Sequence, residues 1–369
     1  MTIEDLALLF TRGIGSRGAA QLVEYFGSAE ALFAASRSTL LNDVGLNEEY
    51  ANRILAMEGM EQAKREIAYC RKHNIMAIAA TDKEYPAPLR EIADRPHVLF
   101  VNGSIESLNM RTLSMVGTRE MSPSAEHVCD TLISGLARNI DKLCIVSGLA
   151  YGIDGACHRS ALRHNVATIG VVAQPLPNIS PAPHRQLAED IIKHGGAIVS
   201  ELPSQSPHNG KLFIARNRII AGMSMGIVIV ESPATGGSLS TANLADGYNR
   251  TVMAVPGRIS DPTSFGTNNL IRSGKARLVL TANDIIEDMD WCVLQPHQGN
   301  NHATEDNKIA ELTPQQRTVL DAISSSTTIS LEKLLACTSM TLGELSMTIL
   351  DLEMEGYVRC LPGKRYERV

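Results

Sequence analysis

Short runs of apolar residues recur through the middle of the chain, and amphipathic stretches separate them. The runs cover residues 76–80, 98–101, 113–116, 143–147, 168–172, 197–200, 226–230 and 251–255. Runs that are this short and apolar throughout are typical of strands buried on both faces of a sheet. The pattern therefore predicts a parallel sheet that is covered on both sides.

Amphipathic stretches between several of these runs have the spacing of helices. They cover residues 124–139, 155–164, 186–194, 214–221 and 240–248. Strands that alternate with helices are typical of an open sheet with helices on both faces. We expect the fold class to be α/β, with a Rossmann-like, doubly wound domain over residues 66–290.

The first 65 residues have a helical pattern that glycine turns interrupt twice. Gly13 and Gly15 form one turn and Gly45 the other, while Gly27 is expected to cap one helix and Ser28 to begin the next. Two such units predict a tandem helix-hairpin-helix (or SAM-like) domain, whose exposed N–H groups could meet a phosphate. An ordinary small helical domain explains the same glycines equally well.

The sequence pattern of the last 79 residues, 291–369, predicts a linker and a third domain. Residues 295–307 are polar and rich in Asn, His and Gln, so we expect a linker over residues 291–307. Thr313 and Pro314 are expected to begin the first helix of a winged-helix domain over residues 308–369. Two further helices and a two-stranded wing at its end complete that pattern.

Composition narrows the class of protein. The chain has 369 residues, 44% of them apolar and 20% charged, which excludes a disordered, collagen-like or coiled-coil protein. Its apolar runs are far shorter than the roughly 20 residues of a membrane helix, and its N-terminus lacks the pattern of a secretory signal. We expect a cytoplasmic protein with no membrane span. With a net charge of −6, any nucleic-acid binding must use a local basic patch.

The seven cysteines are scattered and never spaced as CxxC. A disulfide framework or a zinc site would need closely spaced pairs. We therefore expect reduced packing residues and no metal site.

Candidate chemistry gathers where strands end and helices begin. Four loops there are rich in glycine, hydroxyl or basic residues: 115–119, 147–154, 213–218 and 235–241. Glycine lets a ligand approach the backbone, and a helix N-terminus offers N–H donors to a phosphate. Ligands of doubly wound sheets bind at this edge. Several such loops on one edge favour a polyanion site.

Basic residues strengthen that interpretation. Arg119, Lys211, Arg216 and Arg218 belong to these loops or flank them, and residues 205–218 contain no acidic residue. Arginine binds phosphate oxygens in a bidentate manner. Phe213 could stack on an unpaired base, although core packing is the better explanation for an isolated phenylalanine.

Motifs of the common enzyme classes are absent from the sequence. There is no GxxxxGK[ST], GxSxG or HExxH pattern, and the loop 147–154 does not have the GxGxxG spacing of a dinucleotide site. Asp154 could be a catalytic carboxylate, but at a helix start it more often bonds the loop. His184 either joins the anion site or is a solvated loop residue. We predict no catalytic residue and no cofactor.

An ordered set of motifs resembles the DNA-processing protein A family (DprA, also called Smf). The resemblance covers nearly the whole chain and is strongest over residues 113–274. It rests on Val116-Gly117-Thr118-Arg119, Ser147-Gly148-Leu149-Ala150-Tyr151-Gly152-Ile153-Asp154, Gly195-Gly196-Ala197-Ile198-Val199-Ser200-Glu201, Phe213 with Ala215-Arg216-Asn217-Arg218-Ile219-Ile220-Ala221-Gly222, Gly237-Ser238-Leu239 with Thr241-Ala242, and Ala254-Val255-Pro256-Gly257 with Gly266-Thr267-Asn268.

The resemblance implies a non-enzymatic protein that binds single-stranded DNA. Members of the family protect incoming strands during natural transformation, help to load the RecA recombinase, and work as homodimers built through the Rossmann-like domain. By motif, the family's DNA-contacting positions are Arg119, Lys211, Phe213, Arg216, Arg218 and Arg185, with Gly148, Gly152 and Ser238 shaping the pocket.

Two segments depart from the family pattern. Residues 173–185 lack the usual Gly-Leu-Asp turn and Tyr-Pro pair, although His184 and Arg185 still match. Ile214 replaces the usual proline after Phe213. Neither change removes a basic residue, so we expect binding to persist with altered detail.

Two other functions remain open. The chain is also similar to nucleotide phosphoribohydrolases of the lysine-decarboxylase-like group, whose GGxGTxxE motif carries a glutamate. That glutamate is missing here, although Glu201 and Glu231 lie near strand ends. Alternatively, the winged helix could read duplex DNA through Lys364, Arg365 and Arg368. Residues 308–369 hold 7 Lys and Arg against 8 Asp and Glu, a net charge of −1, which is unfavourable for gripping a duplex.

Overall fold

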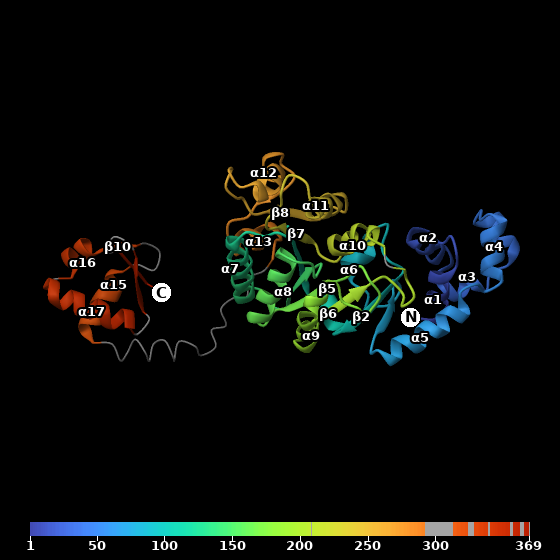
Figure 1. Cartoon of the computed structure of the whole chain (residues 1–369), viewed down its shortest axis with the longest axis horizontal. Helices are drawn as coiled ribbons and strands as arrows, with labels where there is room; N and C mark the ends of the chain where they lie inside the picture. Colours follow the sequence, from blue (N-terminus) through green and yellow to red (C-terminus); the bar gives the residue numbers. More distant parts are fainter. Residues whose placement is uncertain are drawn as a thin grey trace. The chain divides into compact units, whose positions relative to one another are not determined.

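The computed structural model describes residues 1–207, 209–291, 313–323, 328–338, 340–354, 357–361 and 365–368 (Figure 1). The chain divides into two compact units, Met1–Leu294 and Gln295–Val369. The predicted linker, except for Trp291, lies outside the described residues.

A nine-stranded sheet forms the centre of the first unit. Its strands, in spatial order, are β1 (Met76–Ala79), β2 (Val98–Gly103), β6 (Ala197–Ser200), β5 (Ala167–Val171), β4 (Leu143–Ser147), β3 (Arg111–Val116), β7 (Gly226–Ile229), β8 (Thr251–Ala254) and β9 (Arg277–Leu278). Each of the eight apolar runs is a strand, and the strands from β6 to β9 are parallel. The predicted α/β sheet is confirmed.

One edge of the sheet differs from the prediction. β2 pairs antiparallel with both β1 and β6. The connection between β1 and β2 contains only the short helix α6 (Ala87–Glu91), and an antiparallel pair needs no long crossover. At the other edge, β9 was not predicted because it has two residues, both exposed.

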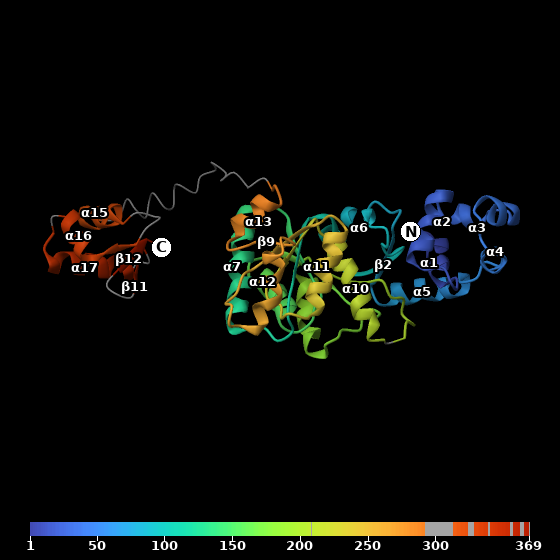
Figure 2. The same ribbon diagram turned by 90° about the horizontal axis from the view of Figure 1, so that it is seen from above.

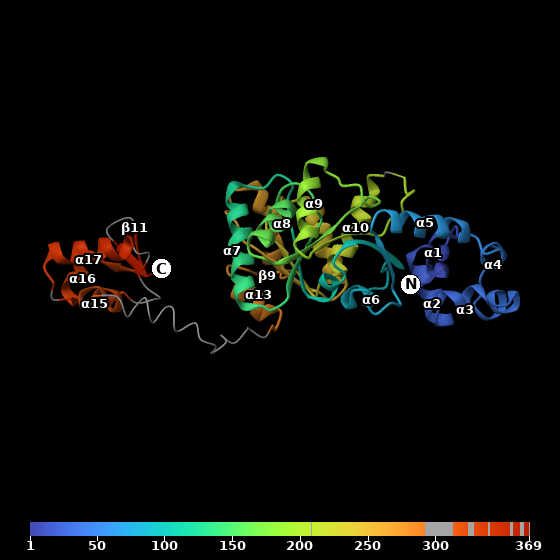
Figure 3. The same cartoon turned by 90° about the horizontal axis from the view of Figure 1, so that it is seen from below.

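Helices cover both faces of the sheet, and Figures 2 and 3 view it from opposite sides. On one face α6, α10 (Lys211–Gly222), α11 (Gly237–Gly247) and α12 (Phe265–Arg272) pack on the strands. On the other face lie α7 (Pro123–Asn139), α8 (Ile153–Arg163), α9 (Arg185–Lys193) and α13 (Ala282–Asp288). No helix in the described part of the chain is long and apolar enough to cross a membrane.

The strand order reverses between β3 and β7. From β3 the chain builds β4, β5 and β6 in one direction, and then returns to the far side of β3 to build β7, β8 and β9. Such a reversal opens a crevice beyond the carboxyl ends of the two central strands, because their loops turn to opposite faces. The crevice is the expected place for a ligand.

The N-terminal region is helical, as predicted. It comprises α1 (Ile3–Phe10), α2 (Ser16–Phe26), α3 (Ala29–Phe33), a π-helical turn (Thr39–Asp43), α4 (Glu48–Leu55) and α5 (Met60–Lys72). Gly27 ends α2 with a φ of 80°, and Ser28 accepts a hydrogen bond from the Ala31 N–H, so both predicted caps are confirmed. The predicted boundary at residue 65 falls inside α5, whose helix packs with the sheet in a common apolar core.

The second unit is a small winged helix. It contains α15 (Pro314–Ala322), β10 (Ile329–Ser330), α16 (Leu331–Cys337), α17 (Leu342–Met354), β11 (Val358–Leu361) and β12 (Arg365–Arg368), with strand order β10-β12-β11. Thr313 caps α15 and Pro314 is its first residue, as predicted. The three helices and the sheet share one apolar core.

Six cysteines lie in the described part of the chain and all are free thiols. Cys70, Cys129, Cys144 and Cys157 are buried, as packing residues should be. The seventh, Cys292, lies outside the described residues.

Candidate nucleic-acid interface

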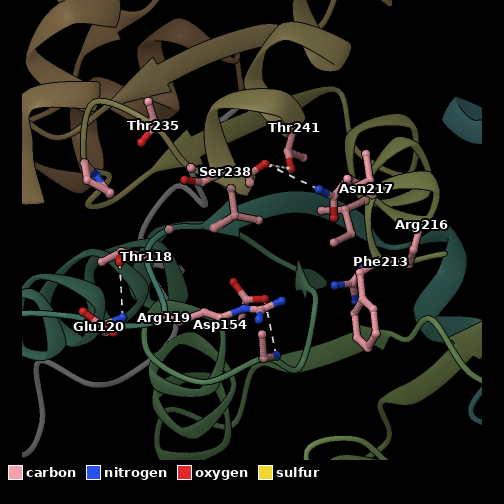
Figure 4. Close-up of a pocket in the computed structure, with 18 residues that line it drawn as sticks. Thr118, Arg119, Glu120, Asp154, Phe213, Arg216, Asn217, Thr235, Ser238 and Thr241 are labelled. Atoms are coloured by element: carbon pink, nitrogen blue, oxygen red, sulfur yellow. Dashed lines mark hydrogen bonds between the residues drawn. The ribbon is translucent and has the colours of Figure 1, made fainter. Parts of the chain in front are cut away.

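A cavity of about 400 Å³ occupies the crevice between β3 and β7 (Figure 4). Loops from β3, β4 and β7 and the first turns of α10 and α11 surround it. Its lining comprises Val116, Gly117, Thr118, Arg119, Glu120, Ala150, Asp154, Phe213, Ile214, Arg216, Asn217, Ile220, Pro233, Thr235, Gly236, Gly237, Ser238 and Thr241. All four loops that the sequence singled out therefore contribute to one cavity.

The start of α11 forms one wall. Gly236 is the N-cap and provides no side-chain hydrogen bond to the helix, so the first N–H groups of α11 keep their capacity for a ligand. The Ser238 hydroxyl donates to the Ser232 hydroxyl at 2.9 Å, and the Thr241 hydroxyl donates to the Gly237 carbonyl at 3.1 Å. Oriented donors at a helix N-terminus favour an anion such as a phosphate.

Arg119 stands opposite that wall, on the loop after β3. The Thr118 N–H donates to the Glu231 carbonyl at 2.7 Å, which fixes the loop to the end of β7. The side chain of Arg119 is exposed, and its guanidinium lies 6.0 Å from the ring centroid of Phe213. Figure 4 shows Arg119 and Phe213 on the same side of the cavity, across from Ser238. A cation and an aromatic ring thus face the helix N-terminus.

The first turn of α10 supplies the aromatic wall. Phe213 is half-buried, and Ile214 beside it is 66% exposed although it is apolar. Lys211, the first residue of the helix, is exposed but does not line the cavity. This turn presents apolar surface and a cation together, which suits a ligand with both rings and phosphates.

Arg216 has a different position from Arg119. Its side chain is buried and its guanidinium donates to the carbonyl of Gly148, at 2.7 Å, and to that of Val171. Asp154, also buried, accepts hydrogen bonds from the N–H groups of Gly148 and Ala150 at 3.1 and 3.4 Å. The carboxylate therefore bonds the loop after β4, as the sequence indicated.

Burial perturbs the pKa of both charged groups. It raises the pKa of Asp154, and the neighbouring Arg216 charge opposes that rise. It lowers the pKa of Arg216 to about 10, which the attraction of Asp154 counteracts. A Cβ atom at Gly148 would lie 2.5 Å from the Asp154 carboxylate, so only glycine fits between the two groups.

Gly152 joins the β3 and β4 loops. Its φ is 73°, and a Cβ there would collide with the carbonyl oxygens of Thr118 and Arg119. The next residue, Ile153, donates its N–H to the Thr118 carbonyl at 3.1 Å. Gly148 is thus hemmed in by two buried side chains and Gly152 by the backbone of the β3 loop, so neither position has room for a side chain.

Besides Lys211, two predicted contacts lie away from the cavity lining. Arg218 forms an ion pair of 2.5 Å with Glu201, and its side chain is 14% exposed. Arg185 is exposed at the start of α9, directly after the buried His184. The His184 Nδ1 lies 2.9 Å from the Leu149 carbonyl oxygen, so this histidine supports the β4 loop. Both arginines are at the same sheet edge as the cavity.

The two carboxylates considered for hydrolysis have structural partners. Burial raises the pKa of Glu201, and its partner Arg218 opposes that rise. Glu231 accepts hydrogen bonds from the Ser122 N–H at 2.8 Å and from the Thr263 hydroxyl at 2.7 Å. Neither glutamate lines the cavity. The carboxylates that do are Glu120 and Asp154, neither of which the sequence favoured for catalysis.

The atypical segment 173–185 lies at the rim beyond β5. The Tyr69 hydroxyl donates to the Leu176 carbonyl at 3.1 Å, and the Ser200 hydroxyl donates to the Gln174 carbonyl at 2.8 Å. These bonds tie the segment to α5 and β6. His184 and Arg185 keep their place at the sheet edge in spite of the altered sequence.

Some lining residues were not singled out as binding residues. Asn217, Thr235 and Thr241 belong to the loops and motifs that the sequence marked, but Ser238 was the only uncharged polar side chain selected from them. The hydroxyl groups of Thr235 and Thr241 beside the glycines at the start of α11, and the amide of Asn217 between two arginines, were the signals that could have found them. Glu120 had no such signal, because it follows Arg119 outside any pattern.

Comparisons with known proteins match the chain to two family models and to several relatives. The family model described as DNA recombination-mediator protein A matches residues 76–290, and the model described as DprA winged helix domain matches residues 303–364. Protein Smf of Escherichia coli (strain K12) is 31% identical over 341 residues, which cover 88% of this chain and 86% of that protein.

Two solved structures are also similar. The X-ray structure of DNA processing protein A from Streptococcus pneumoniae has a TM-score of 0.67 and 28% identity, and the match covers 78% of this chain and 98% of that chain. DNA processing protein A from Helicobacter pylori, solved for its single-stranded DNA binding mode, has a TM-score of 0.53 and 26% identity. That match covers 59% of this chain and 98% of the other.

Proposed function

The chain belongs to the DNA recombination-mediator protein A family, and from this premise we propose that it binds single-stranded DNA in the cavity between β3 and β7. The observation that carries the proposal is the pairing of Arg119 and Phe213 across from the start of α11. A cation, a ring and free helix N–H groups around one cavity suit a phosphate with an unpaired base. The Helicobacter pylori relative, named for single-stranded DNA binding, supports this.

Binding would combine two kinds of contact. Arg119, Lys211 and the first N–H groups of α11 would bind phosphates, and Phe213 would stack on a base. Stacking needs a base that is not enclosed in a duplex, so single strands would be preferred. Neither contact reads a base edge, and the binding would therefore tolerate most sequences.

Arg216 and Arg218 would act from beneath the residues that contact the DNA. The guanidinium of Arg216 holds the carbonyls of Gly148 and Val171, and Arg218 is paired with Glu201. We assign to Arg216 the role of fixing the β4 loop and of adding positive potential beneath the phosphates. Direct contact between either residue and DNA remains a prediction of the sequence.

We propose that the protein is a binder and not a nucleotide hydrolase. The Asp154 carboxylate is occupied by two backbone N–H groups, and the sequence lacks the glutamate of the hydrolase motif. Incubation with nucleoside monophosphates checks this directly. If chromatography detected release of the free base, the result would support the phosphoribohydrolase alternative.

The family suggests the wider role. We propose that the protein is cytoplasmic, protects incoming strands during natural transformation, and passes them to the RecA recombinase. We also propose a homodimer. Leu278 and Leu280 are 45% and 67% exposed at the β9 edge of the sheet, where a partner would cover them. Analytical ultracentrifugation tests the dimer, and a monomeric wild-type protein would contradict it.

The winged helix is a poor candidate for gripping duplex DNA. Helix α17 holds Glu344, Asp351 and Glu353 but neither Lys nor Arg. Phosphates would be repelled from such a helix. We propose a protein-contact role for this unit.

The test of the proposed function is fluorescence anisotropy with labelled single-stranded and duplex oligonucleotides over a series of salt concentrations. We expect tighter binding to the single strand and a steep loss of affinity with salt, because phosphate contacts release counterions. Equal affinity for the two forms would contradict the proposal.

A further inference from the structure

Tyr151 is a large exposed side chain in the loop between β4 and α8. It is 48% exposed. Its neighbours Ala150 and Asp154 line the cavity, but Tyr151 does not. Nothing in the proposed binding of a phosphate and one base uses this ring.

The ring of Tyr151 is held in place from one side. It packs edge-to-face with the ring of His184, with centroids 5.2 Å apart and an interplanar angle of 65°. His184 is buried and its Nδ1 donates to the Leu149 carbonyl at 2.9 Å. An imidazole fixed in this way limits the movement of the tyrosine while half of it stays exposed. The arrangement fits an aromatic platform that is ready to bind.

The loop that carries Tyr151 is fixed to the loop that carries Arg119. Gly152 packs against the carbonyls of Thr118 and Arg119, and the Ile153 N–H donates to the Thr118 carbonyl. Phe213 approaches Arg119 from α10, on one face of the sheet. Tyr151 leads into α8, which covers the opposite face. Phe213 and Tyr151 therefore stand on elements that lead to opposite faces of the sheet.

Arg185 extends this arrangement. It follows His184, the residue that supports Tyr151, and its side chain is exposed at the start of α9. A DNA strand that stayed inside the cavity would not meet Arg185, because this residue does not line the cavity. A strand that crossed the β4 loop would pass Tyr151 and then reach Arg185.

We propose that Tyr151 is a second stacking platform for single-stranded DNA. The base that follows the cavity nucleotide stacks on the Tyr151 ring, and the next phosphate meets Arg185. The inference rests on the proposed binding of single-stranded DNA. It adds the path that the DNA strand follows, from the cavity over the β4 loop towards α9.

Tyr25 provides a matched control. It is 57% exposed and packs edge-to-face on Phe26 with centroids 5.0 Å apart, so its setting resembles that of Tyr151. It lies on α2 in the helical region, however, and does not belong to the loops around the cavity. If removing any exposed tyrosine weakened DNA binding, substitutions of Tyr25 and of Tyr151 would therefore weaken it equally.

The first experiment measures the affinity of the full-length protein for a labelled oligothymidine by anisotropy. Tyr151→Ala should raise Kd at least about fivefold, since one stacked base is removed. Tyr151→Phe should bind like wild type because the ring remains, and Tyr25→Ala should also be unchanged. Wild-type affinity in Tyr151→Ala would overturn the inference.

The second experiment separates stacking from a structural role. The same proteins are titrated with an abasic oligonucleotide of equal length, at low salt. The penalty of Tyr151→Ala should disappear, because no base is left to stack. A penalty that persists on the abasic strand would overturn stacking and assign Tyr151 to loop stability.

Salt dependence supplies an independent readout. Tyr151→Ala should leave the slope of log Kd against log salt unchanged, while Arg185→Ala should make it shallower by about one phosphate contact. An unchanged slope in Arg185→Ala would contradict the direction of the strand. Failure of the wild-type protein to bind either oligonucleotide would instead overturn the proposed function itself.

Discussion

Two arginines line the same cavity and differ in almost every physical respect. Arg119 is exposed, and its guanidinium lies over the face of Phe213, 6.0 Å from the ring centroid. Arg216 is buried, with its guanidinium on two backbone carbonyls and a carboxylate nearby. Arg119 can bind a ligand with little rearrangement. If Arg216 moved to a ligand, the two carbonyls that it now bonds would lose their hydrogen-bond donor. The cavity thus has an outer layer that binds and an inner layer that holds it in shape.

The two layers are defined by a few residues. We call Arg119, Lys211 and Phe213 the outer layer, and Arg216, Asp154 and Gly148 the inner layer. Changes in the outer layer should alter DNA affinity and spare stability, while changes in the inner layer should alter both. A substitution in the outer layer that lowered stability, or one in the inner layer that left stability unchanged, would contradict the division into two layers.

The largest effect is expected for Arg216→Ala. The substitution leaves the buried Asp154 carboxylate without its nearest cation and two carbonyls without donors. We expect a loss of about 3 kcal/mol in the unfolding free energy and a collapse of single-stranded DNA affinity. Urea unfolding and anisotropy measure the two effects. Wild-type stability in this variant would show that the inner layer does not hold the fold.

A second effect follows from His158, which packs beneath the inner layer. Its Nδ1 lies 2.7 Å from the Thr168 hydroxyl, which itself donates to the Ile145 carbonyl, so Nδ1 carries a proton and donates it to Thr168. Burial, and after it the charges of His184, Arg159 and Arg216, lower the pKa of His158 to about 3. A lowered pKa means that the unfolded chain takes up the proton first.

The stability contribution of His158 is therefore complete above pH 6.5 and is lost as the pH falls towards 3. The unfolding free energy should drop by up to about 1.4 kcal/mol per pH unit in this range. His158→Asn should lower stability at pH 7 but flatten the pH profile. Equally steep profiles for both proteins, measured by urea unfolding, would remove His158 from this account.

The smallest effect is expected where the helical region meets the outer layer. The buried carboxylate of Glu66 on α5 accepts the Ser204 N–H at 2.8 Å and the Ser204 hydroxyl at 2.6 Å. Ser204 lies in the loop that leads to Lys211 and Phe213. Ser204→Ala should cost about 1.5 kcal/mol of stability and weaken DNA binding less than Arg119→Ala does. Unchanged affinity would show that this anchor does not position the outer layer.

Much of the fold could be predicted from the sequence, because its strands are continuous apolar runs with helices between them. The antiparallel pairing of β2 and the presence of β9 could not. Pairing direction depends on how the chain returns between β1 and β2, and two exposed residues at β9 carry no pattern. Local patterns predict elements well and connections poorly.

The loops of the site could be predicted from glycines and basic residues, but the two layers could not be distinguished. A signal was nevertheless present. Arg216 lies three and four residues before Ile219 and Ile220, which places it on the buried stripe of α10. Helical spacing alone would have separated Arg216 from exposed cations. The pairing of Arg218 with Glu201 had no signal, because the two residues lie on different elements.

The central claim is that the outer layer binds single-stranded DNA at the carboxyl edge of the sheet. The most direct test compares Arg119→Ala with Arg138→Ala. Arg138 is also exposed, but it lies at the far end of α7, the helix that follows the Arg119 loop. Both variants and the wild-type protein are titrated with a labelled single strand over a salt series, after thermal unfolding has shown that they fold alike.

We expect Arg119→Ala to weaken binding about tenfold and to make the salt dependence shallower, because a charge-assisted phosphate contact and the support of Phe213 are lost. Arg138→Ala should bind like the wild type. Equal affinities for Arg119→Ala and the wild type, or equal losses in both variants, would contradict the account.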